Sequence, residues 1–276
     1  EALPPLSQNW AEQTEALAAF HKRNGYGLFA NYAAFEWRDH ALSPISATDP
    51  IQLSDLKNYE LQRSQVVDNT ESFVCGLPAN NVLLYGDRGT GKSSTIHAIL
   101  NAYKEQGLRM IEIPKSAVEE LSLIREYLAD SPMKFIIYID DLSFDSQDNA
   151  FTELKAALEG GLSACQPNTL IYATSNRRHL LPEYMKDNLS YQHADNGEVH
   201  PGEAIEEKIS LSERFGLWVS FYPFSQDEYL AIVAQWLSSL GVDAQAIAGA
   251  RAQALVWALE RGSRSGRVAY QFARDF

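Results

Sequence analysis

The segment GDRGTGKS, residues 86–93, limits the possible folds of this chain more than any other stretch. An apolar run at 82–85 precedes it, and a helical pattern at 93–106 follows it. Glycine tolerates backbone angles that other residues avoid, so such a loop can turn successive N–H groups and the start of a helix toward one anion. The pattern GxxxxGK followed by Ser or Thr, between a strand and a helix, predicts a phosphate-binding loop. A chance glycine-rich turn is the alternative.

The chemistry of this loop indicates a nucleoside triphosphate bound with Mg²⁺. Lys92 would bring its ammonium group to the β and γ phosphates, and the Ser93 hydroxyl would be a ligand of the metal ion. The residues that we expect to contact the nucleotide are Gly86, Asp87, Arg88, Gly89, Thr90, Gly91, Lys92, Ser93 and Ser94.

Strand-like apolar runs alternate with helical patterns through the middle of the chain. The predicted strands are 82–85, 109–113, 135–139, 170–174 and 217–222. The predicted helices between them are 93–106, 117–129 and 151–159. This alternation is typical of a doubly wound sheet, so we expect a three-layer αβα fold with five parallel strands. After Pro223 only helical periodicity remains, and Ser225 with Glu228 has the pattern of a capping box.

The chain before the first of these strands is predicted to form an arm. Apolar residues recur at helical spacing between 10 and 21, and the aromatic-rich stretch 26–37 predicts a second helix or a hairpin. The patterns together predict three domains. They are a helical arm at 1–49, an αβα nucleotide-binding domain at 50–224 and a small all-helical lid domain at 225–276.

Two acidic residues end the predicted strand 135–139, and an asparagine ends the next predicted strand. In open α/β sheets, ligands bind at the carboxyl ends of the strands. We therefore expect Asp140 to hold Mg²⁺, Asp141 to position the attacking water and Asn176 to contact the γ phosphate. The ordinary alternatives are a helix cap for the two carboxylates and a turn for the asparagine.

The composition restricts the compartment and the partners. The 276 residues include 23 Lys+Arg and 36 Asp+Glu, and this net charge of −13 disfavours non-specific binding to nucleic acid. Cys75 and Cys165 lie far apart without a CxxC partner, which favours a reducing, cytoplasmic compartment and argues against structural zinc. No run approaches the roughly 18 apolar residues of a membrane helix. The irregular spacing of His193, Asp195 and His200 favours a polar loop over a metal site.

Several motifs together resemble those of an AAA+ ATPase. They are GDRGTGKS at 86–93, FIIYIDD at 135–141, ATSN at 173–176, SERFG at 212–216 and GRVAYQF at 266–272. The longer stretches NNVLLYGDRGTGKSS, IYATSNRRHLLPE and HPGEAIEEKISLSERFGLWVSFYPFSQDEYLAI are similar to the bacterial ATP-binding family catalogued as DUF815. The resemblance implies an αβα sandwich with a helical lid, ATP and Mg²⁺ as ligands, and a homo-oligomer such as a ring, with a nucleotide site completed between subunits. It leaves open whether the client is a protein or a nucleic acid.

The resemblance also implies roles for the residues already named. It makes 86–93 the Walker A loop, Asp140 and Asp141 the Walker B pair, and Asn176 the sensor 1 residue. AAA+ proteins usually have glutamate where this chain has Asp141, whose carboxylate is one methylene shorter. This departure favours slow hydrolysis, so a nucleotide-gated switch or loader with little turnover remains an alternative, as does a small-molecule kinase. The segment 112–120 lacks the pore aromatic of polypeptide-threading relatives, which argues against an unfoldase.

Two arginines have roles implied by the same resemblance. Arg214 in SERFG matches the arginine finger, which would reach the γ phosphate of a neighbouring subunit. A surface ion pair with Glu213 or Glu207 is the alternative. Arg267 matches the sensor 2 arginine of the lid, with Arg264 as the competing candidate.

The adenine-binding residues are the least predictable part of the site. Leu56 and Tyr59 lie before the sheet, about where related proteins hold the base, but ordinary core packing accounts for them as well. The basic cluster at 177–179 could contact a neighbouring subunit, a nucleotide or a nucleic acid, or form a solvated strand end.

Overall fold

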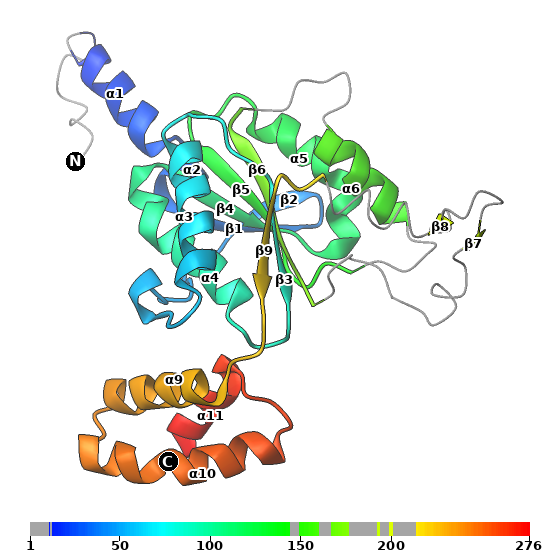
Figure 1. Ribbon diagram of the computed structural model, residues 1–276. Helices are drawn as coiled ribbons and strands as arrows, with labels where there is room; N and C mark the ends of the chain where they lie inside the picture. The colour runs from blue at the N-terminus through cyan, green and yellow to red at the C-terminus, as the bar shows by residue number, and fades with distance from the viewer. Residues whose placement is uncertain are drawn as a thin grey trace.

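The computed structural model describes residues 11, 13–143, 149–159, 167–176, 192–193, 199–200 and 214–276. In these residues helices cover both faces of a central sheet, and the helices α9–α11 lie beyond the ends of β3 and β9 (Figure 1). The predicted α/β class with a C-terminal helical unit is confirmed. Among the helices in the described ranges, none combines the length and the hydrophobicity needed to span a membrane.

The main sheet has seven strands in the order β2-β1-β4-β5-β6-β3-β9. They are β1 (Ala34–Arg38), β2 (Ala41–Pro44), β3 (Val82–Gly86), β4 (Leu108–Glu112), β5 (Lys134–Ile139), β6 (Thr169–Ser175) and β9 (Leu217–Phe221). All five predicted strands form, and they pair only in parallel with one another. The central strands β5 and β6 are buried almost throughout, which explains their continuous apolar sequences. A separate antiparallel pair consists of β7 (Gln192–His193) and β8 (Val199–His200).

Two strands that we did not predict extend the sheet at its β4 edge. β1 pairs in parallel with β4, and β2 returns antiparallel to β1. The two-residue turn between them has Asp39 at φ 51° and His40 at φ 59°, the left-handed region that tight hairpins use. The prediction of a helical arm is therefore wrong for 34–44. Within 26–37, where we expected a second helix or a hairpin, residues 28–31 are helical and 34–37 belong to the first strand of the hairpin. The helices α1 (Thr14–Asn24) and α2 (Leu28–Asn31) precede this hairpin.

The helices between the strands form two layers. The helices α3 (Glu60–Val74) and α4 (Lys92–Tyr103) pack on one face, and α5 (Leu121–Leu128) and α6 (Asn149–Glu159) pack on the other. Short 3-10 helices are η1 (Leu53–Asp55), η2 (Lys104–Gln106) and η3 (Lys115–Glu120). Each predicted helix between strands forms, although the one predicted at 117–129 begins as η3 and continues as α5. Because apolar clusters fill both layers, the strand ends are held rigidly where the loops begin.

The last helices pack around an apolar cluster of their own. They are α9 (Gln226–Ser239), α10 (Ala244–Glu260) and α11 (Gly266–Asp275), and the cluster includes Leu230, Ala254 and Phe272. The predicted capping box starts α9: the Glu228 N–H donates to Ser225 Oγ, and the Ser225 N–H donates to the Glu228 carboxylate. A separate core is what a lid domain requires, while the division of the chain into three domains stays a prediction.

Candidate nucleotide-binding site

The predicted phosphate-binding loop connects the end of β3 to the start of α4. Gly86, Gly89 and Gly91 have φ angles of 132°, 74° and 98°, which residues with side chains rarely adopt. Gly86 is also sterically required, since a Cβ atom there would lie 1.9 Å from the Phe221 carbonyl oxygen on β9. The Asp87 N–H donates to the same carbonyl at 3.1 Å. The backbone of β9 therefore fixes the point at which the loop leaves the sheet.

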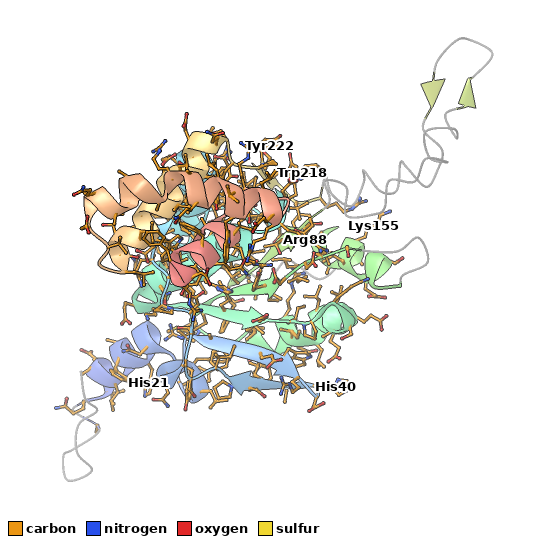
Figure 2. All side chains as sticks on the ribbon, turned by 90° about the horizontal axis from the view of Figure 1, so that it is seen from below. His21, His40, Arg88, Lys155, Trp218 and Tyr222 are labelled. Atoms are coloured by element: carbon orange, nitrogen blue, oxygen red, sulfur yellow. The ribbon has the colours of Figure 1, made fainter. Side chains whose placement is uncertain are left out.

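The other loop residues differ in exposure. Asp87 and Arg88 are exposed, and Ser94 is half-buried in the first turn of α4. Thr90 is buried, and its hydroxyl donates to the Asp87 carbonyl at 2.8 Å. Figure 2, viewed from the side of α9–α11, shows Arg88 beside these helices. The side chains of Asp87 and Arg88 are thus accessible to a ligand at the loop.

The ammonium group of Lys92 is enclosed by the loop. Its Nζ atom donates to the carbonyls of Gly86 (2.8 Å) and Asp87 (2.7 Å) and to Oδ1 of Asn176 (3.1 Å). Burial lowers the pKa of Lys92 to about 8, although nearby carboxylates, Asp141 foremost, oppose this shift. All three acceptors are uncharged, so a phosphate oxygen would be a stronger partner for the ammonium group.

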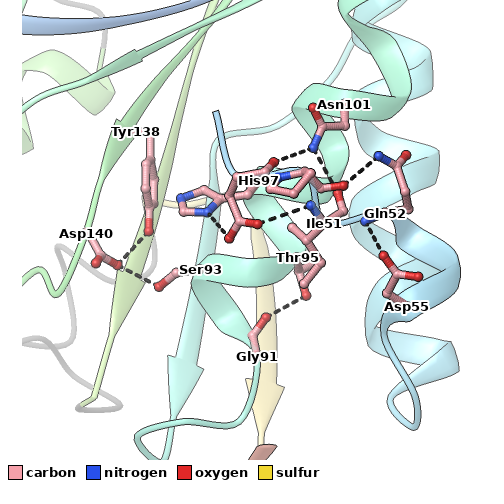
Figure 3. A network of polar contacts seen from close by, with 12 residues as sticks. Ile51, Gln52, Asp55, Gly91, Ser93, Thr95, His97, Asn101, Tyr138 and Asp140 are labelled. Atoms are coloured by element: carbon pink, nitrogen blue, oxygen red, sulfur yellow. Dashed lines mark hydrogen bonds and ion pairs between the residues drawn. The ribbon is translucent and has the colours of Figure 1, made fainter. Parts of the chain in front are cut away.

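One carboxylate oxygen, Oδ1 of Asp140, accepts three hydroxyl hydrogen bonds. The donors are Ser93 (2.8 Å), Tyr138 (2.6 Å) and Thr174 (2.6 Å), and Figure 3 shows the first two. Burial alone would raise the pKa of Asp140, but these bonds outweigh it and hold the pKa below its ordinary value. The structure therefore brings the predicted pair of Ser93 and Asp140 together. We did not predict Tyr138 or Thr174, although each lies two residues before a predicted site residue on its strand, on the same face.

Asp141 and Asn176, predicted from separate strands, are in direct contact. Asn176 Nδ2 donates to Asp141 Oδ1 at 2.5 Å, and the Asp141 N–H donates to the Thr174 hydroxyl at 2.9 Å. Asn176 therefore links Asp141 to the ammonium group of Lys92. The backbone of Asp141 is left-handed, with φ 48°. Aspartate enters this region more readily than most side chains do, which gives a physical reason for aspartate at this position.

The start of helix α11 contacts the phosphate-binding loop. The Gly266 N–H donates to the Gly89 carbonyl at 2.9 Å. A Cβ atom on Gly89 would lie 2.8 Å from Ser265 Oγ and 3.3 Å from the Cβ of Arg267. The exposed side chain of Arg267 therefore starts beside the loop. This geometry favours Arg267 over Arg264, which precedes the helix, as the lid arginine.

Tyr59 connects the sheet to the C-terminal helices. Its ring packs against Phe221 at the end of β9 and against Phe224 before α9, with ring centroids 4.9 and 5.0 Å apart. Its hydroxyl donates to the carbonyl of Tyr222, which lies between these two phenylalanines in the sequence. These contacts account for Tyr59 as packing between the two units, which is the alternative that the sequence left open.

Arg214 lies at the opposite end of the sheet from the loop. It is half-buried in the turn before β9, whose first residue, Leu217, pairs with Val82 at the start of β3. The loop begins at Gly86, paired with the last residue of β9. Five strand residues separate the two ends, or roughly 13–16 Å. Arg214 is therefore not part of the site formed by Lys92 within the same chain.

The Ser93 hydroxyl and the Asp140 carboxylate fit a Mg²⁺ ion, which takes oxygen ligands and commonly binds through one or two carboxylates and substrate phosphates. Within the described ranges, no group of three or more His, Cys, Asp or Glu could hold a metal ion. The basic cluster at 177–179 lies outside the described residues, and so does Asp195. For His193 and His200 only the pairing of β7 with β8 is described, so the sequence prediction about a metal site is untested.

The fold is similar to that of RuvB from Thermotoga maritima, a Holliday junction branch migration motor. The TM-score is 0.53 at 18% sequence identity, over 82% of this chain and 63% of the RuvB chain. Two substituted variants of the same RuvB give 0.53 at 18% and 17% identity, over 82% of this chain and 64% of theirs. The chain thus spans less than two thirds of the RuvB length, and at this identity the likeness shows the fold alone. Among curated proteins none matches.

The family comparison covers more of the chain than the motifs did. Residues 30–276 match the family described as "Protein of unknown function (DUF815)". The match begins well before residues 80–94, the first stretch on which we noted the resemblance, and it includes the β1–β2 hairpin. The chain therefore belongs to the DUF815 family and has the AAA+ fold.

Proposed function

We propose that this chain binds ATP with Mg²⁺ at the loop 86–93 and hydrolyses it to ADP and phosphate, acting as a homo-oligomer that changes the conformation of a client. The observation that carries this proposal is a convergence of groups at one edge of the sheet. Lys92, the pair Ser93 and Asp140, and the pair Asp141 and Asn176 meet there within hydrogen-bond distance. They come from α4 and from the ends of the neighbouring strands β5 and β6, beside β3.

Each group has a distinct task in this proposal. The loop N–H groups and Lys92 would fix the triphosphate. Ser93 and Asp140 would hold Mg²⁺, which when bound neutralises phosphate charge. Asp141 would accept a proton from the water that attacks the γ phosphorus, and ADP would leave as the β–γ bridging bond breaks. Asn176 would keep the Asp141 carboxylate aimed at that water, because it donates to Oδ1.

Two arginines would compensate the charge that develops on the γ phosphoryl group. Arg267 would act from the lid, which contacts the loop through Gly266. Arg214 would act from a neighbouring subunit, since in its own chain it lies at the other end of the sheet from the loop. The proposal that the active form is an oligomer depends on this second arginine.

Binding of MgATP is the first test of the proposal. Titration calorimetry is expected to give a saturable signal for the unaltered protein. In Lys92→Ala the affinity should fall about 10- to 100-fold, the effect of removing a hydrogen bond to a charged group. Lys104→Ala is the matched control, because Lys104 follows the opposite end of the same helix. If the unaltered protein takes up no MgATP, or if Lys92→Ala binds like Lys104→Ala, the proposed function is wrong.

A nucleotide-gated switch with little turnover is the second candidate, and Asp141 favours it. The aspartate carboxylate is shorter than the glutamate usual in AAA+ proteins, so it holds an attacking water less closely. Steady-state phosphate release separates the two candidates. A nearly silent parent that Asp141→Glu accelerates would support the switch, whereas fast release by the parent would remove it.

The client remains unassigned within this proposal. RuvB is a Holliday junction branch migration motor, but this chain is similar to it in fold alone. The similarity therefore gives no reason to propose junction DNA as the client of this chain. The net charge of −13 also disfavours a general affinity for nucleic acid. Pull-down with Asp141→Asn, held in its ATP form, would separate protein clients from nucleic-acid clients.

A further inference from the structure

A cavity of about 190 Å³ lies beside the nucleotide site, between helix α4, the strands β1, β4 and β5, and the segment that follows β2. This segment crosses α4, where Asn101 Nδ2 donates to the carbonyls of Asp49 (2.8 Å) and Ile51 (2.9 Å). Figure 3 shows His97 of α4 between this segment and Tyr138 of β5. The volume is below the roughly 300–1,000 Å³ of drug-sized sites, so it suits one long side chain or one small molecule.

The lining of this cavity is apolar inside and acidic at the rim. Apolar side chains, including Ile45, Leu100 and Met110, form its floor. Two carboxylates, from Asp49 and Glu112, complete the lining together with His97 and Tyr138, and the Asp49 carboxylate lies 3.5 Å from Nδ1 of His97. We call this cavity the Glu112 pocket. An apolar floor with carboxylates above it matches a ligand that has a hydrocarbon stem and a positive head.

The charge of Glu112 has no partner among the described residues. Its neighbour in the register of β1 and β4 is Glu36, which is already paired with Arg38 at 2.8 Å. No hydrogen bond or ion pair is formed by the Glu112 carboxylate within the part of the chain that the structure describes. Burial raises the pKa of Glu112; His97 opposes the rise, and the carboxylates of Asp140 and Glu36 add to it. The Glu112 side chain is exposed at the edge of the pocket and forms no ion pair with a described residue, so a cationic ligand could pair with its carboxylate.

We propose that the Glu112 pocket binds an alkyl cation. Its guanidinium or ammonium group would pair with Glu112, beside the Asp49–His97 pair, and its methylene chain would lie on the apolar floor. A guanidinium can donate two parallel hydrogen bonds to one carboxylate. The Tyr138 ring also lines the pocket, and aromatic rings attract cations. In contrast, an anion would meet two carboxylates, and a neutral polar group would leave Glu112 uncompensated.

The pocket shares a wall with the proposed nucleotide site. The Tyr138 ring lines the pocket, while its hydroxyl donates to Asp140 at 2.6 Å. The ligand of the pocket would therefore touch a residue that orients the carboxylate paired with Ser93. Binding of the cation does not require nucleotide, so this proposal can hold or fail independently of the proposed function.

The test uses butylguanidinium as the probe and butylurea, its neutral counterpart of similar shape, as the control. The chain has three methionines, so methyl-labelled methionine gives a simple NMR spectrum. Met110 lines the pocket, whereas Met133 is buried in the layer on the opposite face of the sheet. Butylguanidinium is expected to shift the Met110 signal saturably and to leave Met133 unchanged. An unchanged Met110 signal at tens of millimolar probe, or an equal response to butylurea, would overturn the proposal.

Substitutions test whether Glu112 is the carboxylate that binds the cation. Glu112→Gln keeps the shape of the side chain and removes its charge, so the probe should bind at least about fivefold more weakly. Glu119→Gln changes an exposed carboxylate on η3, outside the lining, and should bind as the unaltered protein does. Unaltered binding by Glu112→Gln contradicts the proposal. The Met133 signal reports whether Glu112→Gln folds. If it does not, Asp49→Asn is tested instead. The probe should then bind Asp49→Asn more weakly than the unaltered protein, and equal binding would contradict the proposal.

The source of the cation is distinguished by a second probe. Acetyl-Gly-Arg-Gly-amide carries the same guanidinium on a backbone. Binding at least as tight as that of butylguanidinium would assign the pocket to an arginine side chain of another polypeptide. Exclusion of this peptide, with butylguanidinium still bound, would assign it to a free small cation. Both results support the proposed ligand chemistry.

Discussion

The ammonium group of Lys92 should make nucleotide binding depend on pH. Burial lowers the pKa of Lys92 to about 8 in the nucleotide-free protein. The charged form binds phosphate, and this form is lost as the pH rises through the pKa, so binding above it requires uptake of a proton. The dissociation constant for MgATP is therefore expected to be about tenfold larger at pH 9 than at pH 7. Calorimetry at constant ionic strength would measure it.

Lys92→Arg is the control for this pH dependence. The guanidinium group stays protonated throughout this range, so the affinity of Lys92→Arg should not change between pH 7 and pH 9, whatever its absolute value. An equally steep loss of affinity in this variant would show that another group titrates. In that case the lowered pKa of Lys92 would not explain the profile.

Asp141 is the other residue whose role can be tested separately, because its carboxylate should affect turnover but not nucleotide binding. Asp141→Asn preserves the size of the side chain and removes the proton acceptor. Phosphate release should therefore fall about 10²- to 10⁴-fold, the usual effect of losing a general base, while the affinity for MgATP changes little. Parallel measurements of steady-state release and of calorimetric affinity would test this. Equal turnover in Asp141→Asn and the unaltered protein would exclude Asp141 as the base.

At the scale of elements, the contact between the phosphate-binding loop and β9 should dominate the effect of glycine substitutions. Gly86→Ala places a Cβ atom 1.9 Å from the Phe221 carbonyl oxygen, and the strands must separate to admit it. We expect a loss of about 3 kcal/mol or more in the free energy of unfolding. Gly91→Ala is the matched control. Its φ is also positive, at 98°, but nothing lies within 4 Å of the added atom, so it should cost only about 1–2 kcal/mol.

Urea unfolding followed by circular dichroism would compare these two variants. A similar loss of stability in both would mean that the positive φ angles, and not the approach of β9, account for the glycine at position 86. Because the two substitutions add the same single methyl group, the difference between them reports the steric contact together with the difference in φ, 132° against 98°.

The sequence allowed the local elements to be predicted, but not their distant partners. The parallel strands β5 and β6 were found because a strand buried on both faces has a continuous apolar sequence. The hairpin of β1 and β2 was ambiguous, since its parallel partner, β4, lies about 70 residues later and leaves no local pattern. In the same way, the pairing of Ser93 with Asp140 followed from the motif, whereas Tyr138 and Thr174 are common residues that become donors only when the strands align.

At the scale of the whole molecule, the separation between Arg214 and the loop requires a second chain if this arginine takes part in turnover. Leu217 and Val82 pair at one end of the strands β9 and β3, and Phe221 and Gly86 pair at the other. Arg214 precedes Leu217, so it lies about the length of a strand away from the phosphate-binding loop of its own subunit. The strand order places β9 at one edge of the sheet and the β1–β2 hairpin at the other, and Figure 2 shows Trp218 and His40 well apart. In the part of the chain that the structure describes, β9 pairs only with β3, so the strand that follows Arg214 is an edge of the sheet that a neighbour could approach.

Mixing of two inactive variants tests this arrangement. Arg214→Ala retains an intact loop, and Lys92→Ala retains an intact arginine. Neither variant should release phosphate alone. In a random equal mixture, a site is complete where the loop of an Arg214→Ala subunit lies next to Arg214 of a Lys92→Ala subunit. About a quarter of the unaltered activity is then expected from a head-to-tail oligomer. The double variant Lys92→Ala/Arg214→Ala, mixed with Arg214→Ala, should restore nothing because it offers no arginine. Full activity of Arg214→Ala alone, with no gain on mixing, would instead mean that each chain completes its own site.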